Sequence, residues 1–153
     1  SGGGTGGGGT EFCVAPEAWV GTPRDVTRGA DVAAGDVLII LTDDRTGLAT
    51  AEVESNVVGH NFVCTITTAS GAALTLSVNT PVPSRTGGYV MAANAWLIDV
   101  PVLRGDVLTW EPVVSVVARG WQRVQQIRCH QQVYAAGDTP DALIMTHNPY
   151  HKP

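Results

Sequence analysis

Short hydrophobic runs, separated by glycine, proline, aspartate and asparagine, fill the chain from Glu11 onward. The runs are rich in valine, isoleucine and threonine, which favour strands, and the separators are typical of tight turns. We therefore predict a predominantly β domain, in which only the segment 88–99 (GYVMAANAWLID) has the composition for a helical turn or two. The expected strands cover 37–42, 49–55, 61–68, 73–79, 113–120, 123–129 and 142–148.

The pattern occurs twice along the chain. GADVAAGDVLI (29–39) is echoed by LIDVPVLRGDVLT (97–109), and ALTLSVNTP (73–81) by ALIMTHNP (142–149). Between them, VVGHNFVCTI is loosely echoed by VARGWQRVQQI. Three echoes in the same order predict two copies of one β-unit of roughly 70 residues. The copies are too few, and the period too long, for a solenoid. We expect the two units to be related by a pseudo-two-fold axis within one compact body.

The first ten residues, SGGGTGGGGT, differ in composition from the rest. Such a glycine-rich segment cannot pack and is expected to act as a flexible tether. We assign 1–12 to this linker and the flank of the domain, 13–148 to one domain and 149–153 to a short second flank. Between 42 and 47, the run Asp43-Asp44-Arg45-Thr46-Gly47 is typical of a hairpin turn.

Composition and charge narrow the class of protein. The 153 residues include 9 lysine or arginine and 14 aspartate or glutamate, a formal net charge of −5 without any basic cluster. Nucleic acid and anionic membranes are therefore poor partners. The longest aliphatic run, Val37 to Leu41, is too short for a membrane span, and no basic-then-apolar leader is present. A cytoplasmic or virion-associated location is expected rather than secretion.

The odd count of three cysteines means that at least one thiol is free. Cys13 lies at the border between the tether and the domain. A cysteine is commonly a small buried hydrophobic residue, but at this border its sulfur can attack the carbonyl of Phe12. That attack converts the Phe12–Cys13 amide to a thioester. It requires a proton donor and a strained bond, which a fold can supply.

The last predicted strand ends in His147-Asn148, followed by Pro149. An Asn-Pro pair is an ordinary start of a turn. It also permits a second reaction, in which the Asn148 side-chain nitrogen attacks its own main-chain carbonyl, forms a succinimide and releases Pro149. This attack is intramolecular, so orientation lowers the barrier, and the imidazole of His147 can donate the proton that the leaving amine needs.

A cysteine at the start and a His-Asn pair at the end resemble the Hint superfamily, the self-processing module of inteins, hedgehog autoprocessing domains and bacterial intein-like proteins. The resemblance extends from Cys13 to Asn148. It implies an all-β, horseshoe-like pseudo-two-fold fold in which the first and last catalytic residues lie side by side. It is carried by Cys13, DVAAGDVLI, LTLSVNTPV, LRGDVLT, RVQQIRCHQQVYAAG and the ending IMTHN. The tether and the ending are also similar to Hint modules of phage tail proteins.

The resemblance implies roles for six residues. Cys13 would be the nucleophile, and Ser77, Asn79 and Thr80 would support its junction. His147 and Asn148 would form the carboxyl-terminal cleavage pair. The substrate would be the flanking polypeptide itself, with water or an external nucleophile accepting the acyl group, and no cofactor or metal would be needed.

Four positions depart from the family. Ser77 and Thr80 stand where the family has threonine and histidine, and a threonine hydroxyl cannot deliver a proton near pH 7 as histidine can. Gln132, two residues before Tyr134, stands where the family often has another histidine; His60 and His130 are the alternatives elsewhere. Pro149 carries no nucleophile, which excludes ordinary splicing.

These departures leave two interpretations open. The domain is either self-cleaving, or a degenerate Hint-like module with a structural or interaction role, for example in a phage tail. A third interpretation places zinc between the pairs His60/Cys64 and Cys129/His130, although neither spacing is that of a known zinc motif.

Overall fold

The computed structural model describes residues 13–130 and 132–147. The expectations for Phe12, Asn148 and Pro149 therefore lie outside the described residues. Within them the regular structure is strand apart from two 3-10 turns, which confirms the all-β class and the helical turn expected within 88–99. The elements are β1 (Trp19–Gly21), β2 (Val26–Arg28), η1 (Gly29–Asp31), β3 (Val37–Leu41), β4 (Leu48–Glu52), β5 (Ser55–Thr68), β6 (Ala73–Ser77), β7 (Pro81–Pro83), β8 (Tyr89–Met91), η2 (Ala92–Asn94), β9 (Asp99–Arg104), β10 (Val107–Arg128), β11 (Val133–Thr139) and β12 (Ala142–His147).

Each run expected to be a strand contains a strand, but two of the expected strands are parts of a single longer one. The run 113–120 and all but the last residue of the run 123–129 belong to β10, which is 22 residues long and ends at Arg128. Gly120, the last residue of the first run, lies beside a register shift in the pairing with β5, at a φ of 84°. Such a bulge accommodates an extra residue without ending the strand. The loop between β3 and β4 is the turn expected at 43–47, with Arg45 at a φ of 62°.

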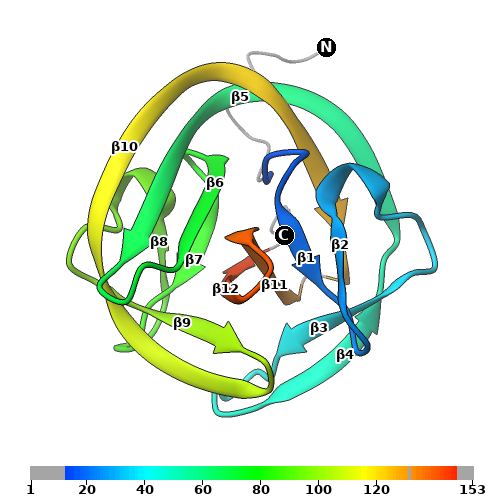
Figure 1. Ribbon diagram of the computed structural model, residues 1–153, viewed down its shortest axis with the longest axis horizontal. Coiled ribbons are helices and arrows are strands. Elements are labelled where there is room, and N and C mark those ends of the chain that lie inside the picture. Colours follow the sequence, from blue (N-terminus) through cyan, green and yellow to red (C-terminus); the bar gives the residue numbers. More distant parts are fainter. Residues whose placement is uncertain (1–12, 131, 148–153) are drawn as a thin grey trace.

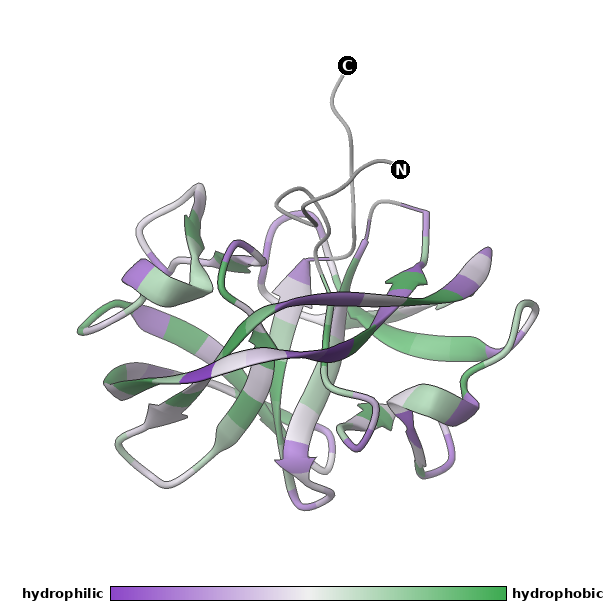
Figure 2. Ribbon diagram, turned by 90° about the horizontal axis from the view of Figure 1, so that it is seen from above, coloured by the Kyte–Doolittle hydropathy of each residue, from purple (hydrophilic) through white to green (hydrophobic). Residues whose placement is uncertain are grey.

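The strands form one curled sheet in the order β2-β1-β11-β12-β9-β10-β5-β6, to which β3 and β4 are joined through β11. A separate hairpin pairs β7 with β8. In Figure 1 the long strands β5 and β10 run around the outside, and β11 and β12 lie in the middle. Seen from above in Figure 2, the two long strands cross in front and carry stretches of hydrophilic residues there.

The two halves repeat one order of elements. A hairpin, a 3-10 turn and a strand form β1-β2-η1-β3 and again β7-β8-η2-β9. The long strands β5 and β10 then pair antiparallel with each other. The units are therefore similar, as predicted, but their register is not that of the echoed Gly-Asp-Val-Leu motif. Gly35 lies in the turn before β3, whereas Gly105 lies in the hairpin between β9 and β10.

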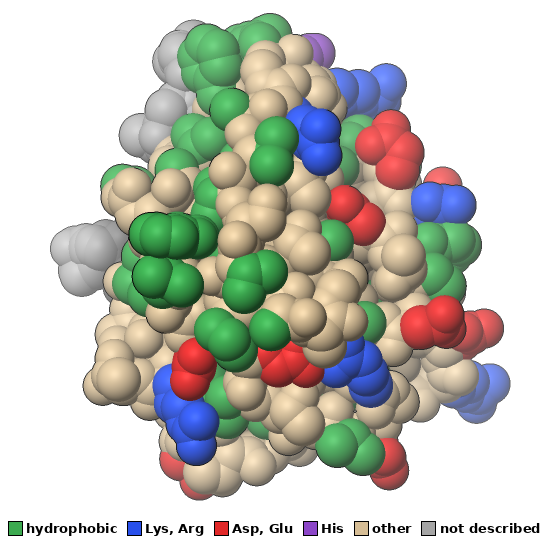
Figure 3. All heavy atoms as spheres, turned by 60° about the vertical axis from the view of Figure 1, so that its left-hand side comes forward, with side chains coloured by type: hydrophobic (Ala, Val, Ile, Leu, Met, Phe, Trp, Pro, Cys, Tyr) green, Lys and Arg blue, Asp and Glu red, His purple; other side chains and the backbone are tan. Residues whose placement is uncertain are grey.

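The interior is formed mainly by aliphatic side chains from both halves. The largest cluster includes Leu38, Leu74, Val102 and Ile144, which come from β3, β6, β9 and β12. Hydrophobic side chains also reach the surface, as Figure 3 shows on the side where β8, β9 and β10 lie. No helix in the described part of the chain is long and apolar enough to cross a membrane.

Candidate functional site

Cys13 begins a short segment before β1 that lies between the strands β6 and β10. Val14 bridges Leu76 of β6 on one side and Gln125 of β10 on the other. Its amide and carbonyl both bond to Gln125, at 3.2 and 2.8 Å. Cys13 itself is fully buried, in a small cluster with Val63 and Val124. The backbone after the predicted cleavage point is therefore fixed from both sides.

Two of the predicted partners contact the backbone of Cys13 directly. The Cys13 N–H donates to Thr80 Oγ1 at 3.0 Å, and the same hydroxyl lies 3.3 Å from Cys13 O. The Ser77 N–H donates to Cys13 O at 2.9 Å. Because Cys13 N belongs to the Phe12–Cys13 peptide bond, the Thr80 hydroxyl lies against the nitrogen of the bond expected to break.

Thr80 and Ser77 are both fully buried, and one turn positions them. The Thr80 N–H donates to Ser77 O at 3.0 Å, and Thr80 O accepts from Ala92 N of η2 at 2.9 Å. The Ser77 hydroxyl has no hydrogen-bond partner among the described residues. An unpaired buried hydroxyl is costly, so its presence beside Cys13 calls for an explanation.

Asn79 lies in the same turn and is tied to β5. Its Oδ1 accepts from Asn61 Nδ2 at 3.2 Å, and Asn61 Oδ1 accepts from its neighbour Phe62 N at 2.8 Å. Asn61 is almost fully buried. No local pattern marks Asn61, because its partner Asn79 is 18 residues away and is brought near by the pairing of β5 with β6.

Tyr134 is buried on β11, near Cys13 at the beginning of the domain, and is paired with β12 at its end. Burial raises the pKa of its phenol, and the neighbouring thiols of Cys13 and Cys129 raise it further. In the pairing of β11 with β12, Tyr134 lies opposite Thr146, directly before His147. The Thr146 hydroxyl is fully buried and, like that of Ser77, has no partner among the described residues. Sequence reasoning missed both residues.

His147 is the last residue of β12 and pairs with Val133. Its imidazole meets the ring of Tyr89 edge to face, with centroids 4.7 Å apart. Tyr89 comes from β8, in the second hairpin. Asn148, the other member of the predicted cleavage pair, lies outside the described residues.

The alternative histidines have other surroundings. His60 is exposed on β5, opposite Arg123. His130 Nδ1 lies 2.7 Å from Glu54 Oε2 at the surface. Burial raises the pKa of the Cys64 thiol to about 11, and burial together with Glu54 does the same for Cys129. Across the described ranges, no three His, Cys, Asp or Glu side chains are grouped to hold a metal ion.

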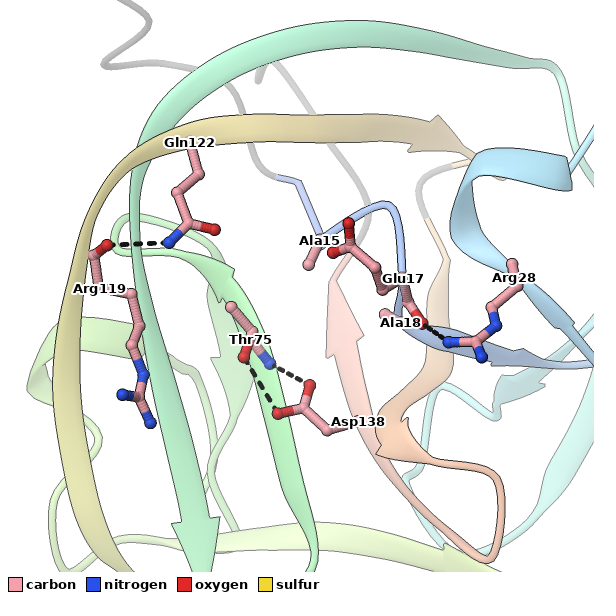
Figure 4. Close-up of a pocket in the computed structure, with 8 residues that line it drawn as sticks. All are labelled: Ala15, Glu17, Ala18, Arg28, Thr75, Arg119, Gln122 and Asp138. Atoms are coloured by element: carbon pink, nitrogen blue, oxygen red, sulfur yellow. Dashed lines mark hydrogen bonds between the residues drawn. The ribbon is translucent and has the colours of Figure 1, made fainter.

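A polar pocket of about 290 Å³ lies beside the segment that carries Cys13 (Figure 4). In it, Thr75 N and Oγ1 donate to the two oxygens of Asp138, at 2.8 and 3.0 Å, and Thr75 O accepts from Ala15 N at 3.0 Å. Asp138 thereby fastens β6, the strand of Ser77, to β11. Its role in the structure is a cross-link between strands.

No family model and no curated protein matches the chain. Among solved structures, the Ssp DnaB mini-intein variant M86 superposes with a TM-score of 0.80 at 14% identity, over 93% of this chain and 96% of the intein. The DnaB intein from Synechocystis sp. PCC 6803 gives 0.76 at 16% identity, over 90% and 98%.

A bacterial intein-like domain from Clostridium thermocellum gives a TM-score of 0.73 at 16% identity, over 90% of this chain and 99% of that domain. In all three cases the likeness covers nearly the whole of both chains, so it concerns the complete architecture. The chain therefore has the all-β Hint fold of inteins and intein-like domains.

Proposed function

We propose that this domain cuts its own flanking polypeptide at Phe12–Cys13. In the first step the Cys13 thiolate attacks the Phe12 carbonyl carbon, the C–N bond breaks, and the Cys13 nitrogen takes up a proton. The product is a thioester between Phe12 and Cys13 with a free Cys13 amine. Water or an external nucleophile then attacks the same carbonyl, the C–S bond breaks, and the thiol is restored.

The observation that carries the proposal is the contact between Thr80 Oγ1 and Cys13 N, at 3.0 Å, in a fold of this class. In this arrangement Thr80 fixes the nitrogen of the leaving group, and Ser77 N fixes the carbonyl on the other side of Cys13. The unpaired Ser77 hydroxyl is available as a donor to the oxyanion that forms on Phe12, a kind of interaction that commonly contributes most to such steps. Asn79 supports the turn that holds both residues.

We propose Asn148 cyclisation as the second reaction. Asn148 Nδ2 attacks its own carbonyl carbon, the bond to Pro149 breaks, and the proline nitrogen leaves with a proton for which His147 is the nearest candidate donor in sequence. The chain then ends in a succinimide. Because Pro149 has no side-chain nucleophile, the two cleavages are separate events, and splicing is not part of this proposal.

One observation favours a second function, that of a non-cleaving structural or interaction module, such as a part of a phage tail. Thr80 holds Cys13 N but cannot act as an acid near pH 7, and His60 and His130 have partners other than this site, Arg123 across the strand pair and Glu54. A site that only holds the backbone would look the same.

Intact-mass spectrometry with and without dithiothreitol separates the two functions. The thiol should release residues 1–12 over hours to days, and a separate loss of residues 149–153 should report the second cleavage. Cys13→Ala should abolish the first loss alone, and Asn148→Ala the second alone. Cys64→Ala, which removes another buried thiol, is the matched control and should cleave like the wild type. A wild-type chain that stays whole for days under thiol would leave the structural module as the function.

A further inference from the structure

Three side chains, those of Arg45, Tyr89 and His147, lie together at the end of β12. Besides its contact with His147, the ring of Tyr89 lies under the guanidinium of Arg45, whose Cζ is 4.8 Å from the ring centroid. The three residues come from the turn between β3 and β4, from β8 and from β12. No local sequence pattern joins them, so only the folded chain brings them together.

Arg45 is itself anchored. Its Nη1 donates to Ser84 O at 2.7 Å, and its backbone N–H donates to Thr42 O at 2.9 Å. Its positive φ of 62° is uncommon for a residue other than glycine and fixes the direction in which the side chain leaves the turn. A cation over an aromatic ring is attractive, so the fixed arginine holds the tyrosine ring in place.

Tyr89 is not a core residue. About half of it is exposed (47%), so burial does not explain the position of its ring. Its described ring contacts are the arginine on one hand and the imidazole on the other. Edge-to-face aromatic pairs attract each other beyond what the buried area contributes, which favours one orientation of the side chain.

A small cavity beside these side chains is lined by Gln132, which stands where the family often has a second histidine. Its volume is about 80 Å³, and Gln132 lines it together with Arg45 and Tyr89. Asp43 also faces this space. A glutamine side chain cannot act as an acid near neutral pH, so Gln132 cannot supply imidazole chemistry at this position, and the orientation of His147 gains importance.

From these contacts we infer that Tyr89, held by Arg45, is a positioning residue that orients the His147 imidazole for cleavage after Asn148. The catalytic role of Tyr89 rests on the proposed second cleavage, whereas the contact between Tyr89 and His147 does not. A misplaced proton donor costs rate steeply, so loss of the ring should slow release of residues 149–153 by about 10- to 100-fold.

The test combines two measurements on the full chain. NMR of the His147 imidazole protons, assigned with His147→Gln, reports the contact as a ring-current shift in an Asn148→Ala background that keeps the carboxyl-terminal flank in place. Mass spectrometry of chains with Asn148 reports the release rate. Tyr89→Phe should retain both the shift and the rate. Tyr89→Leu should lose both, and Trp121→Leu, which removes another exposed aromatic ring, should change neither.

A ring-current shift that survives Tyr89→Leu would overturn the inference, and so would an unchanged release rate after the shift is lost. A wild-type chain that releases nothing but shows the shift would refute the cleavage and the positioning role together, leaving only the contact. Cleavage of the wild type without the shift would refute the role of Tyr89 alone. The two failures are thus distinguishable.

Discussion

At the scale of single residues, the character of the site depends on one hydroxyl. Thr80 both accepts from Cys13 N and lies within reach of Cys13 O, so it clamps the backbone on either side of the cysteine. A hydroxyl can do this as well as an imidazole. It differs in that it cannot exchange a proton with the leaving nitrogen near neutral pH. Positioning and proton transfer are therefore separable at this position.

Restoring a histidine tests that separation. Thr80→His should speed thiol-dependent release of residues 1–12, by 10-fold or more, because a general acid contributes typically about 10²- to 10⁴-fold and part of this will be lost to imperfect placement. Thr80→Val, which keeps the shape and removes the hydroxyl, should slow release. The measurement is the rate of mass loss under dithiothreitol.

Thr80 is fully buried, so the larger imidazole will also cost stability. Thermal melts of both variants control for this. A folded Thr80→His chain that cleaves no faster than the wild type would contradict the assignment of Thr80 to the leaving nitrogen.

The residue scale also shows what the sequence could and could not reveal. The closeness of Cys13, Ser77 and Thr80 was foreseeable, because a family resemblance ties those positions to one site. Tyr89, Asn61 and Tyr134 were not, because each acts through a partner that only strand pairing brings near. Asn148 stays a prediction, since the described strand ends at His147.

At the scale of elements, a polar cluster fastens the hairpin of β5 and β6 to β9 and β10. Glu111 Oε1 accepts from Thr68 Oγ1 at 2.7 Å and from Ser70, while Oε2 accepts from Arg104 Nη1 at 2.7 Å. Burial alone would raise the pKa of Glu111, but these hydrogen bonds and the arginine charge lower it to about 2. The carboxylate is thus favoured in the folded state.

This lowered pKa predicts a pH dependence of stability. Because the folded pKa of about 2 lies below the ordinary 4.5, the contribution of Glu111 is complete above about pH 4.5 and is lost as the pH falls toward 2. Glu111→Gln should therefore reduce the free energy of unfolding at pH 7, by at most about 3 kcal/mol, and the gap should narrow on acidification. Urea unfolding at pH 7, 4 and 3 measures it. The exposed Glu17→Gln is the control, and a gap independent of pH would contradict the charge-based explanation.

Element boundaries show the same limit of sequence reasoning. The sequence predicts two strands at 113–120 and 123–129, but the antiparallel partner β5 pairs with β10 on both sides of Gly120, from Val113 to Arg128. Short strands such as β1 and β7 carry three residues each and leave too brief a pattern to detect. Long-range pairing, rather than local propensity, decides both cases.

At the scale of the whole molecule, the two similar units are interlocked. β11 of the second half pairs with β1 and β3 of the first, and β10 pairs with β5 along most of its length. Neither unit has its own complete sheet. The repeat in the sequence predicts two copies. It does not predict which strands of one copy pair with strands of the other, because that pairing depends on both copies together.

Interlocking predicts that the two halves fold only together. Cutting the chain in the exposed turn between β7 and β8 gives fragments 1–86 and 87–153. Alone, the first fragment lacks β11 and so leaves the edges of β1 and β3 unpaired, which disfavours a stable sheet. Mixed, the fragments should form a one-to-one complex with the circular dichroism of the intact chain.

A second fragment ending at residue 132, without β11 and β12, is the control and should fail to complement. If the fragment 1–86 folds by itself, with strand content and a cooperative melt, then the halves are independent units, and the shared sheet is not what fixes Val14 between β6 and β10.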